Sequence, residues 1–381
     1  MSIKACFLNT KSIFKHAVAV RQCVLSMTLV LLIVACRHGS NDFEKYTFTI
    51  DHINKYTPIR DQGRKQICWI YAMLATFEGD RLALGDSICL SPFYPARNYI
   101  LEQVDGYYNQ GGRKSLTFRA TSLTALRLIG QYGAMPYDAY SHGEKVNFNA
   151  LVENVGLTAQ QSVLNKDGAE QCRKKVEDTV DKHLGYPTPH VHLYGAEYTP
   201  HEFARSVCPP DEYIGYTSFT HHHFYVAFPL EIPDNFDNSE YYNLPIDELT
   251  GMVIKAVKAG RSVCWEGDVS DDGFSFTDGV AVLPEKTDAD KLQDLRQRMF
   301  ENNETTDDHC MCIVGLAHDQ FGERYFIMKN SWGTNNRYHG LMYMSLDYFK
   351  MKTISVVMTK AYHRNINHRH RPDREQYIYL R

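Results

Sequence analysis

The sequence lacks a long hydrophobic run, a pair of cysteines in CxxC spacing and an excess of positive charge. The apolar stretch from Val24 to Ala35 has roughly 12 residues, whereas a helix needs about 20 to cross a bilayer. The formal net charge of −4 gives no electrostatic footprint for nucleic acid, so we expect no such partner. The cysteine spacing excludes a dense disulfide framework, and most of the cysteines after the N-terminal stretch are expected to be free and buried.

The remaining composition is that of an ordinary globular protein. Apolar residues make up 44% and charged residues 23% of the 381 positions, enough for one large domain or two modest ones. The 25 tyrosines favour a fold with a substantial sheet, because aromatic side chains suit a pleated surface.

The N-terminal stretch has the pattern of an export signal. Basic residues precede the apolar stretch, whose length suits the hydrophobic region of a secretory signal. The residues from Ile33 to Cys36 resemble a bacterial lipobox, in which the cysteine is acylated and becomes the mature N-terminus. We therefore expect a lipoprotein signal over 1–35, a tether or linker over 36–57, and attachment of Cys36 to the bacterial cell envelope. A plain signal cleaved nearby is the alternative.

The pattern of apolar residues changes along the chain from helical to strand-like spacing. Helices are expected over 67–84, after Ser91, over 123–132 and within 151–184, with an irregular segment over 199–210. After about residue 211 the sequence predicts short strands and a single helix. Strands are expected over 213–219, 224–230, 263–266, 311–316, 325–329, 340–345 and 354–359, and the helix over 246–258. This order predicts an α+β domain over 58–360, with a helical half to about 210, a β half from 211 and a solvated basic tail over 361–381.

Cys68 is the strongest candidate for a catalytic nucleophile. It stands at the expected start of a long apolar helix, where the helix dipole and the unpaired amide N–H groups favour the thiolate. The thiolate is the reactive form of cysteine. Its partner base should be a histidine held in one tautomer by a third group. His309, at the head of an apolar strand, and Asn330, after a later strand, offer that pair.

Three separated blocks of sequence resemble the papain family of cysteine peptidases. They are Gln62 to Trp69, Asp308-His309, and the Asn-Ser-Trp-Gly block that starts at Asn330, and they occur in the family's order. The resemblance implies that Cys68 is the nucleophile and that His309 is the general base, oriented by Asn330.

The same resemblance assigns three supporting residues. Gln62 would donate its side-chain N–H to the oxyanion, Trp332 would shield the bond between the histidine and the asparagine from water, and Trp69 would support the nucleophile. This chain has Lys65 where papain has a cysteine, so that family disulfide is absent here.

Runs in the β half, including Tyr241 to Leu249, resemble the bleomycin hydrolase and aminopeptidase C branch of that family. Members of this branch act mainly as aminopeptidases, because their C-terminal tail occupies part of the cleft and captures the free amine of the substrate. They also commonly form hexamers. The tail of this chain is unlike theirs, which leaves the oligomeric state open.

Two further features have less specific patterns. Gly111-Gly112 resembles the paired glycines that line the family's substrate groove, and an ordinary turn is the alternative. The run from His221 to His223 invites a metal site, but consecutive strand residues point to opposite faces, so we expect no metal and no cofactor.

Together these observations predict a papain-like cysteine peptidase of the cell envelope, acting on a peptide or protein substrate, with aminopeptidase specificity first. The alternatives are an envelope endopeptidase and a non-catalytic peptide-binding lipoprotein of the same fold. Acyl transfer to an amine, as in transglutaminase-like relatives, is a third possibility that the block from Asn330 disfavours.

Overall fold

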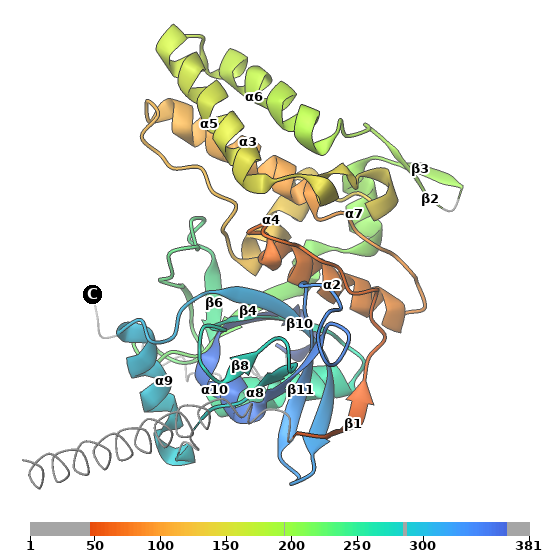
Figure 1. Ribbon diagram of the computed structural model, residues 1–381, viewed down its shortest axis with the longest axis vertical. Helices are drawn as coiled ribbons and strands as arrows, with labels where there is room; N and C mark the ends of the chain where they lie inside the picture. The colour runs from red at the N-terminus through yellow and green to blue at the C-terminus, as the bar shows by residue number, and fades with distance from the viewer. Residues whose placement is uncertain (1–45, 194, 285–287, 364–381) are drawn as a thin grey trace, which may run out of the picture. The chain divides into compact units, whose positions relative to one another are not determined.

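The computed structural model describes residues 46–193, 195–284 and 288–363. The chain divides into two units, Met1–Tyr46 and Thr47–Arg381, and the description concerns the second. Within it, a helical part and a part built on one large sheet adjoin at helix α2 (Figure 1). The predicted α+β class is therefore confirmed.

The helical half begins with α2, which is buried along most of its length. A helix that is apolar all round belongs inside a protein, and α2 lies between the other helices and the sheet (Figure 1). The predicted helices are present, and the 151–184 segment forms two of them. The helices of this half are α2 (Cys68–Ala83), α3 (Phe93–Asn109), α4 (Ser122–Tyr132), α5 (Phe148–Asn165), α6 (Ala169–Leu184) and α7 (Pro200–Val207), and the hairpin strands are β2 (Val191–Leu193) and β3 (Ala196–Tyr198).

The β half is organised by one sheet in the order β5-β6-β4-β13-β7-β10-β11-β12-β9-β8. Its longest strand, β10, pairs antiparallel with both β7 and β11, so it lies in the middle of the sheet. These strands are β4 (Tyr213–Thr217), β5 (Ala227–Pro229), β6 (Glu240–Asn243), β7 (Val263–Gly267), β8 (Phe274–Ser275), β9 (Val280–Ala281), β10 (His309–Asp319), β11 (Arg324–Lys329), β12 (Leu341–Ser345) and β13 (Thr353–Thr359), and the helices of this half are α8 (Ile246–Lys258), α9 (Leu292–Glu301) and α10 (Leu346–Lys352).

The prediction of a linker over 36–57 is wrong for its second half, which contains a strand. Strand β1 (Phe48–Ile53) pairs antiparallel with the end of β10, with Phe48 opposite Asp319 and Ile53 opposite Gly315. Most of its side chains are exposed, which is why the segment reads as polar linker. The strand is held by its backbone pairing and by Phe48, whose ring stacks on Tyr343 with centroids 4.0 Å apart. Composition does not reveal the backbone pairing.

Three local expectations also need correction. The segment expected to be irregular contains α7, whose start is fixed by a capping box between Thr199 and Glu202. The single helix expected in the β half is joined by α9 and α10. Residues 220–223 form a turn between β4 and β5, so the three histidines do not lie on a strand.

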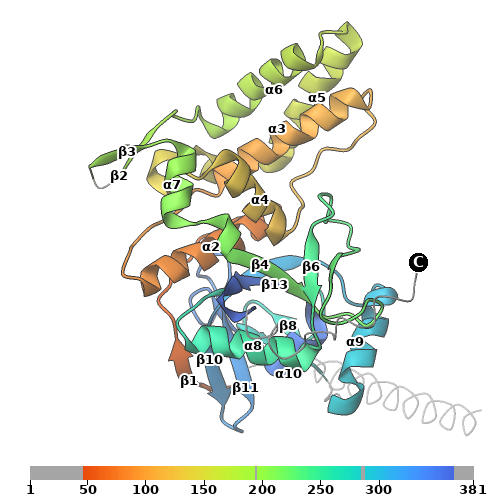
Figure 2. The same ribbon diagram turned by 180° about the vertical axis from the view of Figure 1, so that it is seen from behind.

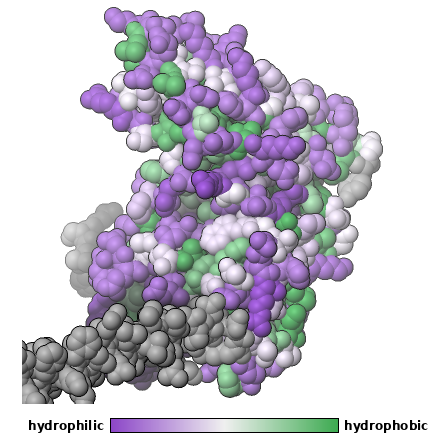
Figure 3. Space-filling model, in the orientation of Figure 1, coloured by the Kyte–Doolittle hydropathy of each residue, from purple (hydrophilic) through white to green (hydrophobic). Residues whose placement is uncertain are grey.

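The two faces of the sheet are covered by different helices. Cys264 and Cys310 point to the core shared with α2, and Trp265 and Met311 belong to the core shared with α8. Figure 2 shows α8 and α10 on this second face. The face seen in Figure 3 is mostly hydrophilic over the helical half. The seam where α2 meets the start of β10 is where the candidate site residues meet.

Candidate active site

Cys68 is the first residue of α2 and is half-buried. The N-cap residue Ile67 makes no side-chain hydrogen bond to the helix, and the first amide N–H groups of a helix have no partner within it. The pKa of the Cys68 thiol lies well below its usual value. A hydrogen bond from Cys310 is the largest cause, and a hydrogen bond and charge from His309 act in the same direction against the effect of burial. The site therefore favours the nucleophilic thiolate.

His309 is the first residue of β10, and Asn330 directly follows β11, its antiparallel neighbour. The imidazole Nε2 lies 2.8 Å from the Asn330 Oδ1, an acceptor, so Nε2–H donates and Nδ1 is the nitrogen left for Cys68. The indole of Trp332 stacks on the imidazole with centroids 4.3 Å apart. Both His309 and Asn330 are buried, which protects their hydrogen bond from water.

Asn330 is itself held from both ends of its amide. Its Oδ1 also accepts from the backbone N–H of Ser331 at 2.7 Å, and its Nδ2 donates to the sulfur of Met342 at 3.4 Å. The amide is thereby oriented with its oxygen towards the histidine.

Gln62 reaches the same site because its segment runs beside the residues after β11. Its backbone N–H donates to the carbonyl of Ser331 at 2.8 Å, and the neighbouring Asp61 forms an isolated antiparallel β-bridge with Trp332. The Gln62 Oε1 accepts from the Ser331 hydroxyl at 2.6 Å, and its Nε2 donates to the Lys65 carbonyl at 2.9 Å. These two bonds orient the amide, and an Nε2 amide carries two N–H groups, so one is left for a ligand.

Trp69 supports the opposite wall of the site. Its buried indole donates from Nε1 to the carbonyl of Phe118 at 2.8 Å. This bond positions the segment that continues through Arg119 and Ala120, and both of these residues line the cavity beside Cys68.

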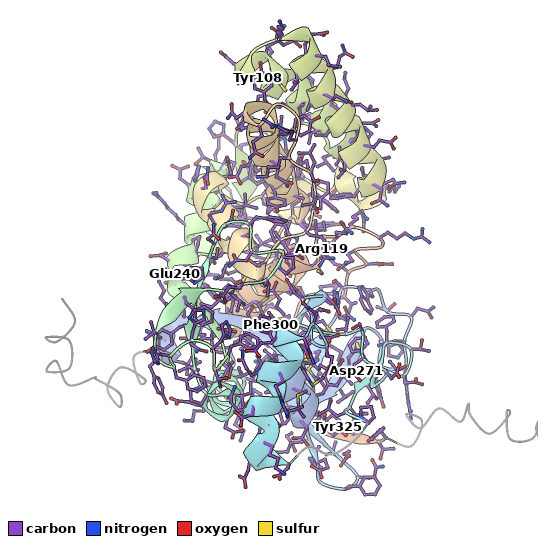
Figure 4. The ribbon with its side chains drawn as sticks, turned by 90° about the vertical axis from the view of Figure 1, so that its left-hand side faces the viewer. Tyr108, Arg119, Glu240, Asp271, Phe300 and Tyr325 are labelled. Atoms are coloured by element: carbon purple, nitrogen blue, oxygen red, sulfur yellow. The ribbon has the colours of Figure 1, made fainter. Side chains whose placement is uncertain are left out.

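One cavity of about 230 Å³ is lined by three of the four predicted catalytic residues, and the fourth, Asn330, lies behind His309. Cys68, His309, Gln62 and Trp332 all line it, although they are separated by up to about 270 positions in sequence. In Figure 4, Arg119 marks the level of this seam between the helical half and the sheet.

The cavity also holds charged residues that the sequence did not single out. Arg119 binds both oxygens of Asp234, at 3.0 and 2.9 Å from its Nε, and donates from Nη2 to the backbone carbonyl of Asp307 at 3.1 Å. Asp307 and Asp308 line the cavity directly before His309. The pKa of Asp307 is raised well above its usual value, first by burial and then by the charges of Glu266 and Asp234.

Gly111 and Gly112 do not lie at this cavity. Their amides close the turn after α3 by donating to the carbonyls of Tyr108 and Tyr107 at 2.9 Å, and Figure 4 shows Tyr108 at the end of the helical half remote from Arg119. Their φ values of 61° and 80° are those of a glycine turn. The predicted groove position is therefore wrong, and Arg119 and Ala120 occupy the wall of the cavity instead.

The histidine run differs from its expected geometry. Because 220–223 is a turn, His221 and His222 converge on Glu231, with Nε2 to carboxylate distances of 3.1 and 2.6 Å. Gln297 Nε2 lies 2.9 Å from the Nδ1 of His221, which makes Nδ1 the acceptor and Nε2–H the donor to Glu231. A ring with this pattern has no free lone pair at Nε2 to offer to a metal ion.

Comparison with known proteins agrees with this geometry. Residues 195–372 match the model of the Peptidase C1-like family. Over this segment the chain is similar to papain-like cysteine peptidases. The matched segment contains two of the three sequence blocks, those at His309 and Asn330, and supports the resemblance that they carry.

The curated relatives are named as aminopeptidases, as expected for the aminopeptidase C branch. Aminopeptidase G of Lactobacillus delbrueckii subsp. lactis is 26% identical over 160 residues, covering 40% of this chain and 36% of the relative. Aminopeptidase E of Lactobacillus helveticus is 26% identical over 158 residues, with the same coverage. The matched segment thus spans about a third of the length of these curated relatives.

The similarity of fold extends further than the similarity of sequence. The crystal structure of PepW from Lactobacillus rhamnosis HN001 has a TM-score of 0.63 at 17% identity, covering 82% of each chain. At this identity the likeness concerns the fold. It confirms the papain-like architecture.

Cys36 lies outside the described residues, as does most of the basic tail over 361–381. Among the helices of the described residues, none is both long and apolar enough to cross a bilayer.

Proposed function

We propose that this protein hydrolyses peptide bonds through a covalent thioester on Cys68. The observation that carries the proposal is the meeting, in one cavity, of a thiol with a lowered pKa and a histidine hydrogen-bonded to Asn330. This is the arrangement of a nucleophile, a base and an orienting group that acyl transfer requires.

The first half of the reaction forms the thioester. The Cys68 thiolate attacks the carbonyl carbon, and the carbonyl electron pair moves to oxygen. The Gln62 Nε2–H and the backbone N–H of Cys68 are the donors proposed for this oxyanion. When the intermediate collapses, the C–N bond breaks, and His309 gives its Nδ1 proton to the leaving amine.

The second half regenerates the thiolate. Water attacks the thioester carbon and passes a proton to His309, and the C–S bond breaks as the carboxylic acid product forms. Throughout, Asn330 keeps the imidazole in one orientation, and Trp332 covers their hydrogen bond.

We further propose that the substrate is cleaved from its N-terminus, as the names of the curated relatives suggest. The test is hydrolysis of one fluorogenic dipeptide, with its amine free and acetylated, by the full chain purified in detergent. Cleavage of the free-amine form only, lost in Cys68→Ala, is the expected result. Equal cleavage of both forms would identify an endopeptidase. Cleavage of neither, across several sequences under reducing conditions, would favour a peptide-binding protein.

The location remains a proposal from the sequence: a lipid on Cys36 would hold the enzyme at the cell envelope. Cells grown with a clickable palmitate analogue should label the wild-type chain, and Cys36→Ser should remove the label. Labelling of the Cys36→Ser chain would overturn this assignment.

A further inference from the structure

An unpaired carboxylate lies within the candidate active site. Asp307 is 9% exposed, lines the cavity of Cys68, and also lines an adjoining hollow of about 430 Å³. Its Oδ2 is buried and has no hydrogen-bond partner among the described residues. A buried carboxylate oxygen without a donor is costly, and native proteins rarely keep one without a use.

A second buried carboxylate lies behind the first. Glu266 of β7 is opposite Cys310 in the sheet and is 1% exposed. Its Oε2 accepts from the Ser355 hydroxyl at 2.8 Å, and its Oε1 has no partner among the described residues. Burial raises the pKa of Glu266 to about 7, and the Cys68 and Asp234 charges add to this effect. The charges of Glu266 and Asp234 also raise the pKa of Asp307, because they repel the negative charge of its carboxylate.

The charge of Arg119 lowers the pKa of Asp307, but by less than burial and the neighbouring acids raise it. The guanidinium of Arg119 is committed to the carboxylate of Asp234, and it meets Asp307 only through the backbone carbonyl. Asp308, the neighbouring acid, is exposed and accepts from the Thr306 hydroxyl at 2.9 Å. The raised pKa of Asp307 and of Glu266 means that the charged form of each acid is disfavoured without a cation beside it, and a bound cation would stabilise that charged form.

The position of Asp307 indicates which cation it can meet. It interacts electrostatically with Cys68 and stands two residues before His309 in the chain. In a peptide cleaved after its first residue, the α-ammonium is only two bonds from the carbonyl carbon that is attacked. A primary ammonium has three donors, so it can bond several carboxylate oxygens at once.

We infer that Asp307, with Glu266 behind it, binds the N-terminal ammonium of the peptide whose first bond is cleaved. This inference rests on the proposed function and adds the group that selects a free amine. The group that binds the ammonium is thus the side chain of Asp307, which belongs to the folded domain. A lysine one residue before the residue whose carbonyl is attacked offers the same ammonium chemistry through its side chain. The experiment therefore includes such a substrate as a separate arm.

The test uses Asp307→Asn, which keeps the side-chain volume and removes the charge. The full chain is assayed on three fluorogenic substrates that share one leaving group: a free-amine aminoacyl compound, its acetylated form, and an acetylated dipeptide with lysine first. The ratio of kcat/KM for the free amine to that for the acetylated form should fall by about 30-fold or more, the loss expected when one charge of a buried pair is removed.

Asp51→Asn is the matched control, because it is the same substitution on an exposed carboxylate that lies outside the cavity and is already bonded to His318. It should keep the preference for the free amine. An unchanged ratio in Asp307→Asn would overturn the inference. So would a loss confined to the lysine dipeptide, since that result would assign the pocket to a substrate side chain.

A second measurement keeps the inference testable if Asp307→Asn does not fold. Leucinamide and N-acetyl-leucinamide are compared as competitive inhibitors of the wild-type protein, and the free amine should bind about 30-fold or more tightly. Equal inhibition would overturn the inference. Failure of the proposed function looks different, because wild type and Cys68→Ala would then be equally inactive on every substrate.

Discussion

Replacement of Asn330 by alanine tests how the histidine is held. The substitution removes a 2.8 Å hydrogen bond between two side chains that are 3% and 2% exposed. In the reactive ion pair the imidazole is positively charged, and this bond then joins a charged donor to a neutral acceptor. Without it, the ring can rotate on its Trp332 neighbour, and the cation loses its acceptor.

The expected effect follows from the strength of such a bond. A hydrogen bond to a charged group contributes about 1.5–3 kcal/mol, which corresponds to a loss of about 10- to 150-fold in kcat/KM. The Cys68 thiol pKa should rise in the same variant, because the thiolate is stabilised in part by the His309 charge. Both quantities are measurable: peptide hydrolysis gives the first, and the pH dependence of iodoacetamide alkylation gives the second.

The control is Asn330→Asp, which keeps an acceptor oxygen at the same place and should retain the low thiol pKa. Thermal unfolding of each variant separates a local effect from loss of structure, since Asn330 also accepts from the Ser331 amide. If Asn330→Ala stays within about threefold of wild type in kcat/KM while remaining folded, the orienting role is refuted.

Three other substitutions test neighbouring parts of the account. Gln62→Ala should lower kcat by about 10²- to 10³-fold with a small change in KM, as for other oxyanion donors, and steady-state kinetics check this. Cys310→Ala should raise the pKa of the Cys68 thiol, because the Cys310 hydrogen bond is the largest stabiliser of the thiolate, and alkylation rates at pH 6 should fall. For Glu266, the folded pKa of about 7 lies above the usual 4.5, so the stability it contributes is present below pH 4.5 and is lost as the pH rises through 7. Relative to Glu266→Gln, the wild-type free energy of unfolding should therefore fall by on the order of 3 kcal/mol between pH 4.5 and 8 in denaturant titrations, and a pH-independent difference would contradict this.

The residues of the candidate site that the sequence predicts lie in contiguous blocks. Cys68 could be placed because the helical periodicity begins beside it, and α2 does begin at Cys68. His309 and Asn330 could be placed because each stands at the end of an apolar strand. Antiparallel pairing of β10 with β11 then brings their side chains together.

The residues that were missed depend on contacts without a local signal. Arg119 meets Asp234 across 115 positions, and neither segment is periodic or rich in a motif. Asp307 did have a signal, since two successive aspartates precede His309. Its burial depends on the pairing of β10 with β7, which sequence patterns do not give.

The errors in the fold have similar physical origins. The sequence of β1 predicts a linker because its side chains are mostly exposed, and composition does not show its backbone pairing with β10. Helix α7 could have been found, since Thr199, Pro200 and Glu202 form a recognisable helix start. Gly111-Gly112 shows the opposite case, because a glycine pair predicts a substrate groove as readily as the turn after α3 that it forms.

The central claim is that the acyl group of the substrate is carried by Cys68. The most direct measurement is an acid quench of the full chain during turnover of an activated peptide ester, followed by peptide mapping with mass spectrometry. The account predicts a mass increase equal to the acyl group on the peptide that contains Cys68, and its absence in Cys68→Ala. Acylation of Cys310 instead, or continued turnover by Cys68→Ala, would contradict the account.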